Sequence, residues 1–182
     1  MLISKFKSTD IIEKLEEYED VLGTSIPSQF RAFLQKYNGG ETPQTVYKCG
    51  KASFDIKALY GLGDVKYSLD NTTPIDRDGI RYLPIGCDTF GNEIVLDLTT
   101  GNICFLNHEN GTVIRIEDDF KLFVSKCKSE GIKKSSLKSI EERETDLIKK
   151  GRGHIITDAL RDMWQAEIDK NSSMVLEEIL ID

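Results

Sequence analysis

Apolar side chains recur every three or four positions near the start of the chain, with mostly charged residues between them. The apolar positions of this first segment are Ile11, Ile12, Leu15, Tyr18 and Leu22. This spacing predicts an amphipathic helix. Thr9 or Asp10 can cap its start, and Gly23 can end it.

A second amphipathic helix is predicted to begin at Pro27, because proline suits the first helical position and keeps Ile26 out of the helical region. We expect it to end at Asn38-Gly39-Gly40, since Asn and Gly accept the positive φ of a helix C-cap. Its apolar stripe consists of Phe30, Phe33, Leu34 and Tyr37. The two helices are neighbours in sequence and should pack as a pair.

From Thr42 onward the pattern changes to short apolar segments separated by turn residues, which predicts strands. Strands are expected over 44–48, 53–62, 81–87, 93–97, 103–106 and 112–116. Tight turns between sequential strands predict an antiparallel meander. A helix should then open at Glu117 or Asp118 and end at Gly131, with an apolar stripe of Phe120, Phe123, Val124 and Cys127.

Residues 1–131 therefore predict an α+β domain, with a central antiparallel, meander-like sheet flanked by the N-terminal helix pair and by C-terminal helices. Residues 132–182 predict a helical extension that packs on the same domain, because about fifty residues bury too little to be stable alone. We expect a helix over 141–150, a second with a stripe containing Met163 and Trp164, and a last helical turn over 175–180. Met163 and Trp164 are interpreted as core residues, with a partner hot spot as the alternative.

Composition narrows the class of protein. The chain has 182 residues, 39% of them apolar and 30% charged, with a formal net charge of −7. These values suit one soluble globular domain with a sizeable core. No apolar run is long enough to span a membrane, and no signal peptide is recognised, so we expect a cytoplasmic protein. The acidic balance argues against direct nucleic-acid binding and favours a basic partner.

The four cysteines are Cys49, Cys87, Cys104 and Cys127. None forms a CxxC pair, and the chain has 2 histidines, so a structural zinc site is not expected. We predict reduced, buried thiols and no metal or cofactor.

Several short motifs occur in an order that resembles the SUKH superfamily, the Smi/Knr family. The first half supplies Leu22-Gly23, Ile26-Pro27, Phe30, Phe33-Leu34, Asn38-Gly39-Gly40 and Leu59-Tyr60-Gly61-Leu62. The second half supplies the run from Leu83 to Ile94, which is similar to a PIG-x-D-x-x-G-N-x-I centre, then Asn107-His108-Glu109, Phe120 and Phe123. The resemblance covers roughly residues 10–128 and leaves the tail outside.

This resemblance implies an α+β fold with a central antiparallel sheet, and a non-enzymatic role. Bacterial members of the family look like immunity proteins that bind and neutralise a cognate toxin, often a nuclease, in polymorphic toxin systems. Fungal members are scaffolds in cell-wall signalling. The resemblance therefore favours an immunity protein, with a non-catalytic scaffold or interaction module as the alternative.

Most candidate chemical motifs are interpreted structurally. Gly39-Gly40 lacks the remaining residues of a phosphate loop and is interpreted as a C-cap. Asp88 to Asn92 has too few oxygen ligands for calcium and predicts a turn in which Asp88 accepts local amide hydrogens. The polar segment 70–79 is likewise interpreted as a loop. His108 and Glu109 could act as an acid–base pair in an unrecognised hydrolase, but no nucleophile motif accompanies them.

The acidic residues give the more useful hypothesis. Acids cluster on the first predicted helix, and a second run is Glu117-Asp118-Asp119. An acidic surface can dock in the basic groove of a nuclease, speed the encounter and block the substrate. The predicted partner-binding residues are Glu13, Glu16, Glu17, Asp20, Asp88, His108 and Glu109. No catalytic residue and no oligomeric state are predicted.

Overall fold

The computed structural model describes residues 1–49 and 52–181, which divide into two compact units. The first unit comprises Met1–Ser129 together with residues 176–181, and the second comprises Glu130–Val175. The end of the chain therefore returns to the first unit. The expectation that the helical part of the tail packs on the sheet domain stays a prediction.

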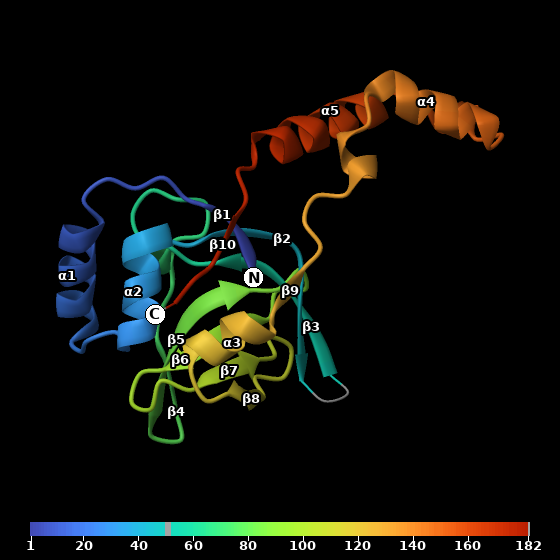
Figure 1. The fold of residues 1–182 in the computed structure, drawn as a ribbon. Coiled ribbons are helices and arrows are strands. Elements are labelled where there is room, and N and C mark those ends of the chain that lie inside the picture. Colours follow the sequence, from blue (N-terminus) through green and yellow to red (C-terminus); the bar gives the residue numbers. More distant parts are fainter. Residues whose placement is uncertain (50–51, 182) are drawn as a thin grey trace. The chain divides into compact units, whose positions relative to one another are not determined.

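The first unit contains an antiparallel sheet, which confirms the predicted α+β fold (Figure 1). The described strands are β1 (Leu2–Lys5), β2 (Gly40–Cys49), β3 (Ala52–Leu59), β4 (Ile75–Arg77), β5 (Ile80–Cys87), β6 (Glu93–Asp97), β7 (Ile103–Leu106), β8 (Val113–Glu117), β9 (Lys128–Ser129) and β10 (Glu177–Glu178). Their order is β10-β1-β2-β3-β5-β6-β7-β8, with β4 beside β5 and β9 beside β2. The run from β5 to β8 is the predicted meander.

Two strands at one end of the sheet escaped the sequence prediction. β1 received no assignment, and the predicted last helical turn over 175–180 is wrong, because that segment contains β10. β10 pairs with β1 through the register Leu2↔Glu178 and Ile3↔Glu177. The pairing buries Ile3 and Ile179. β10 has two residues, which is too short to show an alternation of apolar and polar positions. Only its pairing with β1, far away in sequence, identifies it as a strand.

Helices α1 (Ile11–Leu22) and α2 (Ser28–Tyr37) lie side by side, as predicted (Figure 1). Asp10 occupies the N-cap position of α1 in a left-handed conformation and makes no capping hydrogen bond, so the expected cap is absent. Gly23 and Asn38 are left-handed C-caps, as predicted. Pro27 is the N-cap of α2 rather than its first helical residue.

Helix α3 (Phe120–Lys126) begins later and ends earlier than predicted. Its N-cap is Asp119, whose carboxylate accepts a hydrogen bond from the Leu122 amide, and its C-cap is Cys127 rather than Gly131. Glu117 belongs to β8, where it pairs with Ile103 of β7. Pattern alone could not separate the end of a strand from an acidic first helical turn.

Aromatic rings from α2 and α3 build the core beneath the sheet. The rings of Phe30 and Phe120 lie 5.1 Å apart edge to face, and those of Phe33 and Phe120 lie 5.1 Å apart. Tyr47 from β2 extends the cluster to Phe123, at 5.4 Å. These side chains are at most 2% exposed, so their burial contributes a large part of the hydrophobic stabilisation.

Two glycine motifs meet where α2 passes into β2. The Asn38 side chain donates to the Leu62 carbonyl oxygen at 3.1 Å and accepts from the Leu62 amide at 2.8 Å. A Cβ atom at Gly61 would lie 2.1 Å from the Asn38 carbonyl oxygen, and one at Gly39 would lie 2.5 Å from the Gly61 amide nitrogen. Only glycine permits this approach of two backbones. The Asn-Gly-Gly and Leu-Tyr-Gly-Leu motifs are thus parts of one structural junction.

The second unit contains α4 (Ile140–Lys149) and α5 (Asp158–Ser173), linked by the 3₁₀ turn Gly153–Ile155. Another 3₁₀ turn, Lys134–Leu137, precedes α4. Arg143 holds this unit together: it donates to the Ser136 and Lys138 carbonyl oxygens, pairs with Glu167 at 2.8 Å and lies over the Trp164 ring. Neither α4 nor α5 contains a fully buried side chain.

Candidate interaction surface

Four carboxylates form one exposed face of α1. Glu13, Glu16, Glu17 and Asp20, which we call the acidic stripe, lie along one side of the helix, where each has neighbours three or four residues away. All four side chains are exposed. Within the described residues none of them forms an ion pair or a side-chain hydrogen bond. The stripe is therefore a dense, uncompensated negative surface.

The arrangement of the stripe opposes helix stability. Carboxylates at (i, i+4) repel each other by about 0.2–0.5 kcal/mol per pair in an isolated helix, and Glu13/Glu17 and Glu16/Asp20 are such pairs. Asp20 also lies near the negative end of the helix dipole, and the last turn of α1 contains no basic residue. The packing of α1 does not require these charges, because all four side chains are exposed. Residues that oppose local stability in this way are typical of binding surfaces.

A fifth acid of the same helix has a structural role instead. Glu19 accepts a hydrogen bond from the Ile26 amide at 2.8 Å and pairs with Arg31 at 3.2 Å. Its side chain is only 15% exposed. Glu19 therefore ties the loop after α1 to α2 and lies outside the acidic stripe.

We expect Glu19→Ala to lower the free energy of unfolding by about 1–3 kcal/mol, because the Ile26 amide and Arg31 lose a charged partner. Glu16→Ala, the control on the same helix, should change it by less than about 0.5 kcal/mol. Urea denaturation of the two variants measures the difference. Equal destabilisation would contradict this division of the α1 acids.

The second acidic run does not form a comparable surface. Glu117 is 6% exposed, accepts from the Tyr47 hydroxyl at 2.6 Å and pairs with Lys126. Asp118 pairs with Arg115, and Asp119 caps α3. All three carboxylates serve local structure, so the hypothesis of an acidic docking surface rests on α1.

Asp88 holds the turn between β5 and β6. Its carboxylate is 3% exposed and accepts hydrogen bonds from the Phe90 amide, the Asn92 amide and the Asn92 side chain, at 2.7–2.8 Å. The predicted bonding of Asp88 to local amides is thus confirmed. Because its side chain is buried, Asp88 can contribute to partner binding only by stabilising the turn that contacts the partner.

Asn92 connects that turn to the next one, between β7 and β8. Its side-chain oxygen accepts from the His108 amide at 3.1 Å and lies 3.0 Å from His108 Nδ1. His108 and Glu109 are exposed, and so is Phe90, at 73%. Sequence reasoning missed Phe90, whose only signal was a large apolar residue within a predicted turn. The predicted partner-binding residues thus fall into two groups, the acidic stripe and these two turns.

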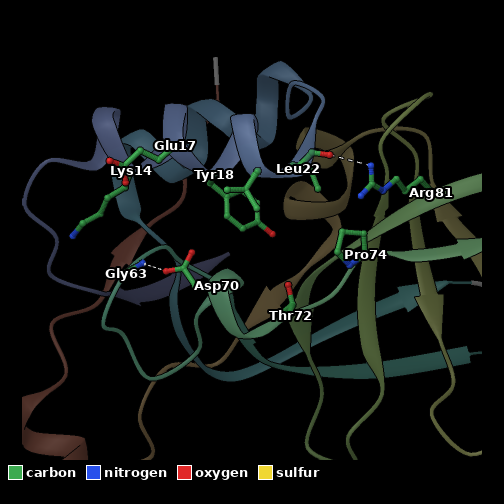
Figure 2. Close-up of a pocket in the computed structure, with 10 residues that line it drawn as sticks. Lys14, Glu17, Tyr18, Leu22, Gly63, Asp70, Thr72, Pro74 and Arg81 are labelled. Atoms are coloured by element: carbon green, nitrogen blue, oxygen red, sulfur yellow. Dashed lines mark hydrogen bonds between the residues drawn. The ribbon is translucent and has the colours of Figure 1, made fainter.

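A pocket of about 500 Å³ opens along α1 beside the acidic stripe (Figure 2). One wall is α1 itself, with Tyr18 and Leu22, and the opposite wall is the segment after β3, with Asp70, Thr72 and Pro74. The remaining lining residues are Lys14, Glu17, Val21, Gly63 and Arg81. Arg81 donates to the Leu22 carbonyl oxygen at 3.0 Å, and Asp70 accepts from the Gly63 amide at 2.8 Å. Glu17 belongs to both the pocket and the stripe.

Two of the three described thiols are buried, as predicted. Cys104 and Cys127 are buried, and burial raises their pKa values to about 11 and about 12. Cys87 is half-buried, and burial raises its pKa as well. The Cys49 side chain lies outside the described residues. Among the described residues no three His, Cys, Asp or Glu side chains gather in a way that could hold a metal ion.

Comparison with known proteins identifies the family. The model of the SMI1 / KNR4 family (SUKH-1) matches residues 12–126, so the chain belongs to this family, as its motifs indicated. The matched region contains the acidic stripe, the pocket and both turns. Residues 127–182 lie outside the match.

One curated relative is an SPbeta prophage-derived uncharacterized protein, YokK, of Bacillus subtilis (strain 168). It is 31% identical to this chain, and the alignment covers 58% of this chain and 66% of the relative. The chain thus spans just under two thirds of the length of that relative. The search of solved structures gives no significant match. No helix in the described part of the chain is long and apolar enough to cross a membrane.

Proposed function

We propose that this protein is an immunity protein, which binds a cognate toxin with a basic surface and neutralises it by stoichiometric occlusion. The observation that carries the proposal is the acidic stripe: four exposed, unpaired carboxylates on one helix face, kept although they repel one another. Membership of the SMI1 / KNR4 family (SUKH-1) supports it, because the bacterial members that the sequence resembles have this role.

The charge distribution supports a basic partner. Residues 130–175 contain nine basic and nine acidic side chains, so the whole net charge of −7 lies outside that segment. A surface of this sign accelerates encounter with a basic groove and disfavours acidic partners. A nuclease domain is the proposed partner class, because its groove must attract a polyanion.

The proposed role is binding without catalysis. The Nδ1 atom of His108 contacts an amide oxygen, that of Asn92, whereas a catalytic histidine is usually oriented by a carboxylate and paired with a nucleophile. The hydrolase alternative would need a nucleophile beside His108, and no motif supplies one. Binding rather than turnover is therefore proposed.

Co-expression with the toxin encoded beside this gene tests the proposal. We expect cells that produce the toxin alone to stop growing, and cells that also produce this protein to grow normally. A catalytically inactive toxin should co-purify with this protein as a complex. Growth arrest despite equal expression of both proteins would overturn the immunity role, and a stable complex without rescue would favour the scaffold alternative.

A further inference from the structure

The pocket beside α1 combines an apolar floor with polar groups at its rim. Tyr18, Val21, Leu22 and Pro74 supply most of the apolar lining. Val21 is 86% exposed, so the apolar surface continues out of the pocket onto the face of α1. Such a site suits a ligand with a long apolar stem and a polar head.

The Tyr18 hydroxyl is a buried polar group without a hydrogen-bond partner of normal geometry among the described residues. The Thr72 hydroxyl faces it in Figure 2, but Thr72 donates its own hydrogen to the Leu69 carbonyl oxygen at 2.8 Å. Burial raises the pKa of Tyr18, so the phenol stays protonated at neutral pH. An unpartnered buried hydroxyl is unfavourable, and a ligand that hydrogen-bonds to it relieves that cost.

The charges around the pocket favour a cation. Asp70 uses one carboxylate oxygen for the Gly63 amide and keeps the other available, and Glu17 has no partner in the described chain. Of the two lining cations, Arg81 is engaged by the Leu22 carbonyl oxygen and lies 4.0 Å from Asp76. Lys14 lies at the opposite end from Arg81 in Figure 2, and its ammonium group extends toward Gly63, away from the space beside Tyr18. The acidic stripe adds its negative potential.

We propose that this pocket receives an arginine side chain of the partner, with its guanidinium group between Glu17 and Asp70. The stem would lie against Val21, Leu22 and the face of the Tyr18 ring, and the planar head would donate to the Tyr18 hydroxyl. Arginine fits better than lysine because its planar head carries five donors in a fixed fork and can serve several acceptors at once, whereas the ammonium group of lysine is a single point charge. That the arginine belongs to a toxin rests on the proposed function, whereas the preference of the pocket for guanidinium does not.

The test uses the ¹⁵N-labelled full chain and no toxin. The probe is N-acetyl-L-arginine N-methylamide, titrated to about 50 mM and followed by amide chemical shifts. The matched control is the citrulline derivative, which has the same shape without the charge. We expect saturable shifts at Val21, Gly63 and Asp70 with arginine, at least about tenfold weaker binding of citrulline, and intermediate binding of the lysine derivative.

Two substitutions assign the effect to the pocket. Asp70→Asn keeps an acceptor for the Gly63 amide and should weaken arginine binding several-fold. Glu16→Gln makes the same charge change on α1 outside the pocket lining and should leave binding unchanged within twofold. Equal binding of arginine and citrulline, shifts that map elsewhere, or no saturation would overturn the proposal. None of these results affects the outcome of the rescue experiment, so failure of the arginine pocket can be distinguished from failure of the proposed immunity role.

Discussion

Gly61→Ala is expected to destabilise the first unit by about 3 kcal/mol or more, and to prevent folding if the native protein is only marginally stable. The new Cβ atom would lie 2.1 Å from the Asn38 carbonyl oxygen, a backbone atom that cannot move without displacing the end of α2. Separation of the two segments would also break the paired hydrogen bonds between Asn38 and Leu62. The free energy of unfolding in urea measures the effect.

Gly23→Ala is the control for this prediction. Gly23 has a φ of +73°, and its Cβ atom would meet nothing within 4 Å. Only the left-handed backbone then opposes the substitution, which should cost about 1–2 kcal/mol. If Gly61→Ala proved no more destabilising than Gly23→Ala, the close approach of the two motifs would not be the reason for their glycines.

Neutralising the acidic stripe should weaken toxin binding by about 30–1000-fold. The variant combines Glu13→Gln, Glu16→Gln, Glu17→Gln and Asp20→Asn. This range corresponds to about 2–4 kcal/mol for several charge pairs across an interface. The dependence of the dissociation constant on salt should flatten at the same time. The free energy of unfolding should stay equal or rise by a few tenths of a kcal/mol, because like-charge repulsion disappears.

A control variant makes the same change in net charge at other exposed acids that form no ion pair among the described residues. It combines Asp64→Asn, Glu130→Gln, Asp162→Asn and Glu178→Gln. We expect it to bind the toxin within about threefold of the unmodified protein. Isothermal titration calorimetry at low and at physiological salt measures both variants. Equal losses in the two would mean that net charge, rather than the stripe, attracts the partner.

The pattern of apolar and turn residues predicted the helices and strands that depend on residues close in sequence. The apolar stripes of α1 and α2, the C-caps Gly23 and Asn38, and the strands β6 and β7 follow from residues close in sequence. β1 and β10 could not be predicted this way, because they pair with each other across about 175 residues, and the other partner of β1 is β2, on the far side of both helices in the sequence. Long-range pairing leaves no local signal in so short a segment.

The candidate surface was predicted only in part, for a similar reason. Acids at helical spacing showed that α1 carries a negative face, but the pattern could not show that Glu19 turns inward to the Ile26 amide. It also could not show that Glu117 accepts from Tyr47, 70 positions earlier in the chain. The pocket joins α1 to Asp70, Thr72 and Arg81, which no spacing brings together. Partners that are distant in sequence decide which acids remain free to bind.

Titration of toxin activity with this protein tests the central claim most directly. A fixed amount of the purified toxin domain is incubated with increasing amounts of the full chain, and its remaining activity is measured after two incubation times. We predict a linear fall that reaches a minimum at one equivalent and is the same at both times, since occlusion consumes one molecule per toxin. Inactivation that is complete well below one equivalent and deepens with time would indicate turnover, and undiminished activity at excess protein would contradict neutralisation altogether.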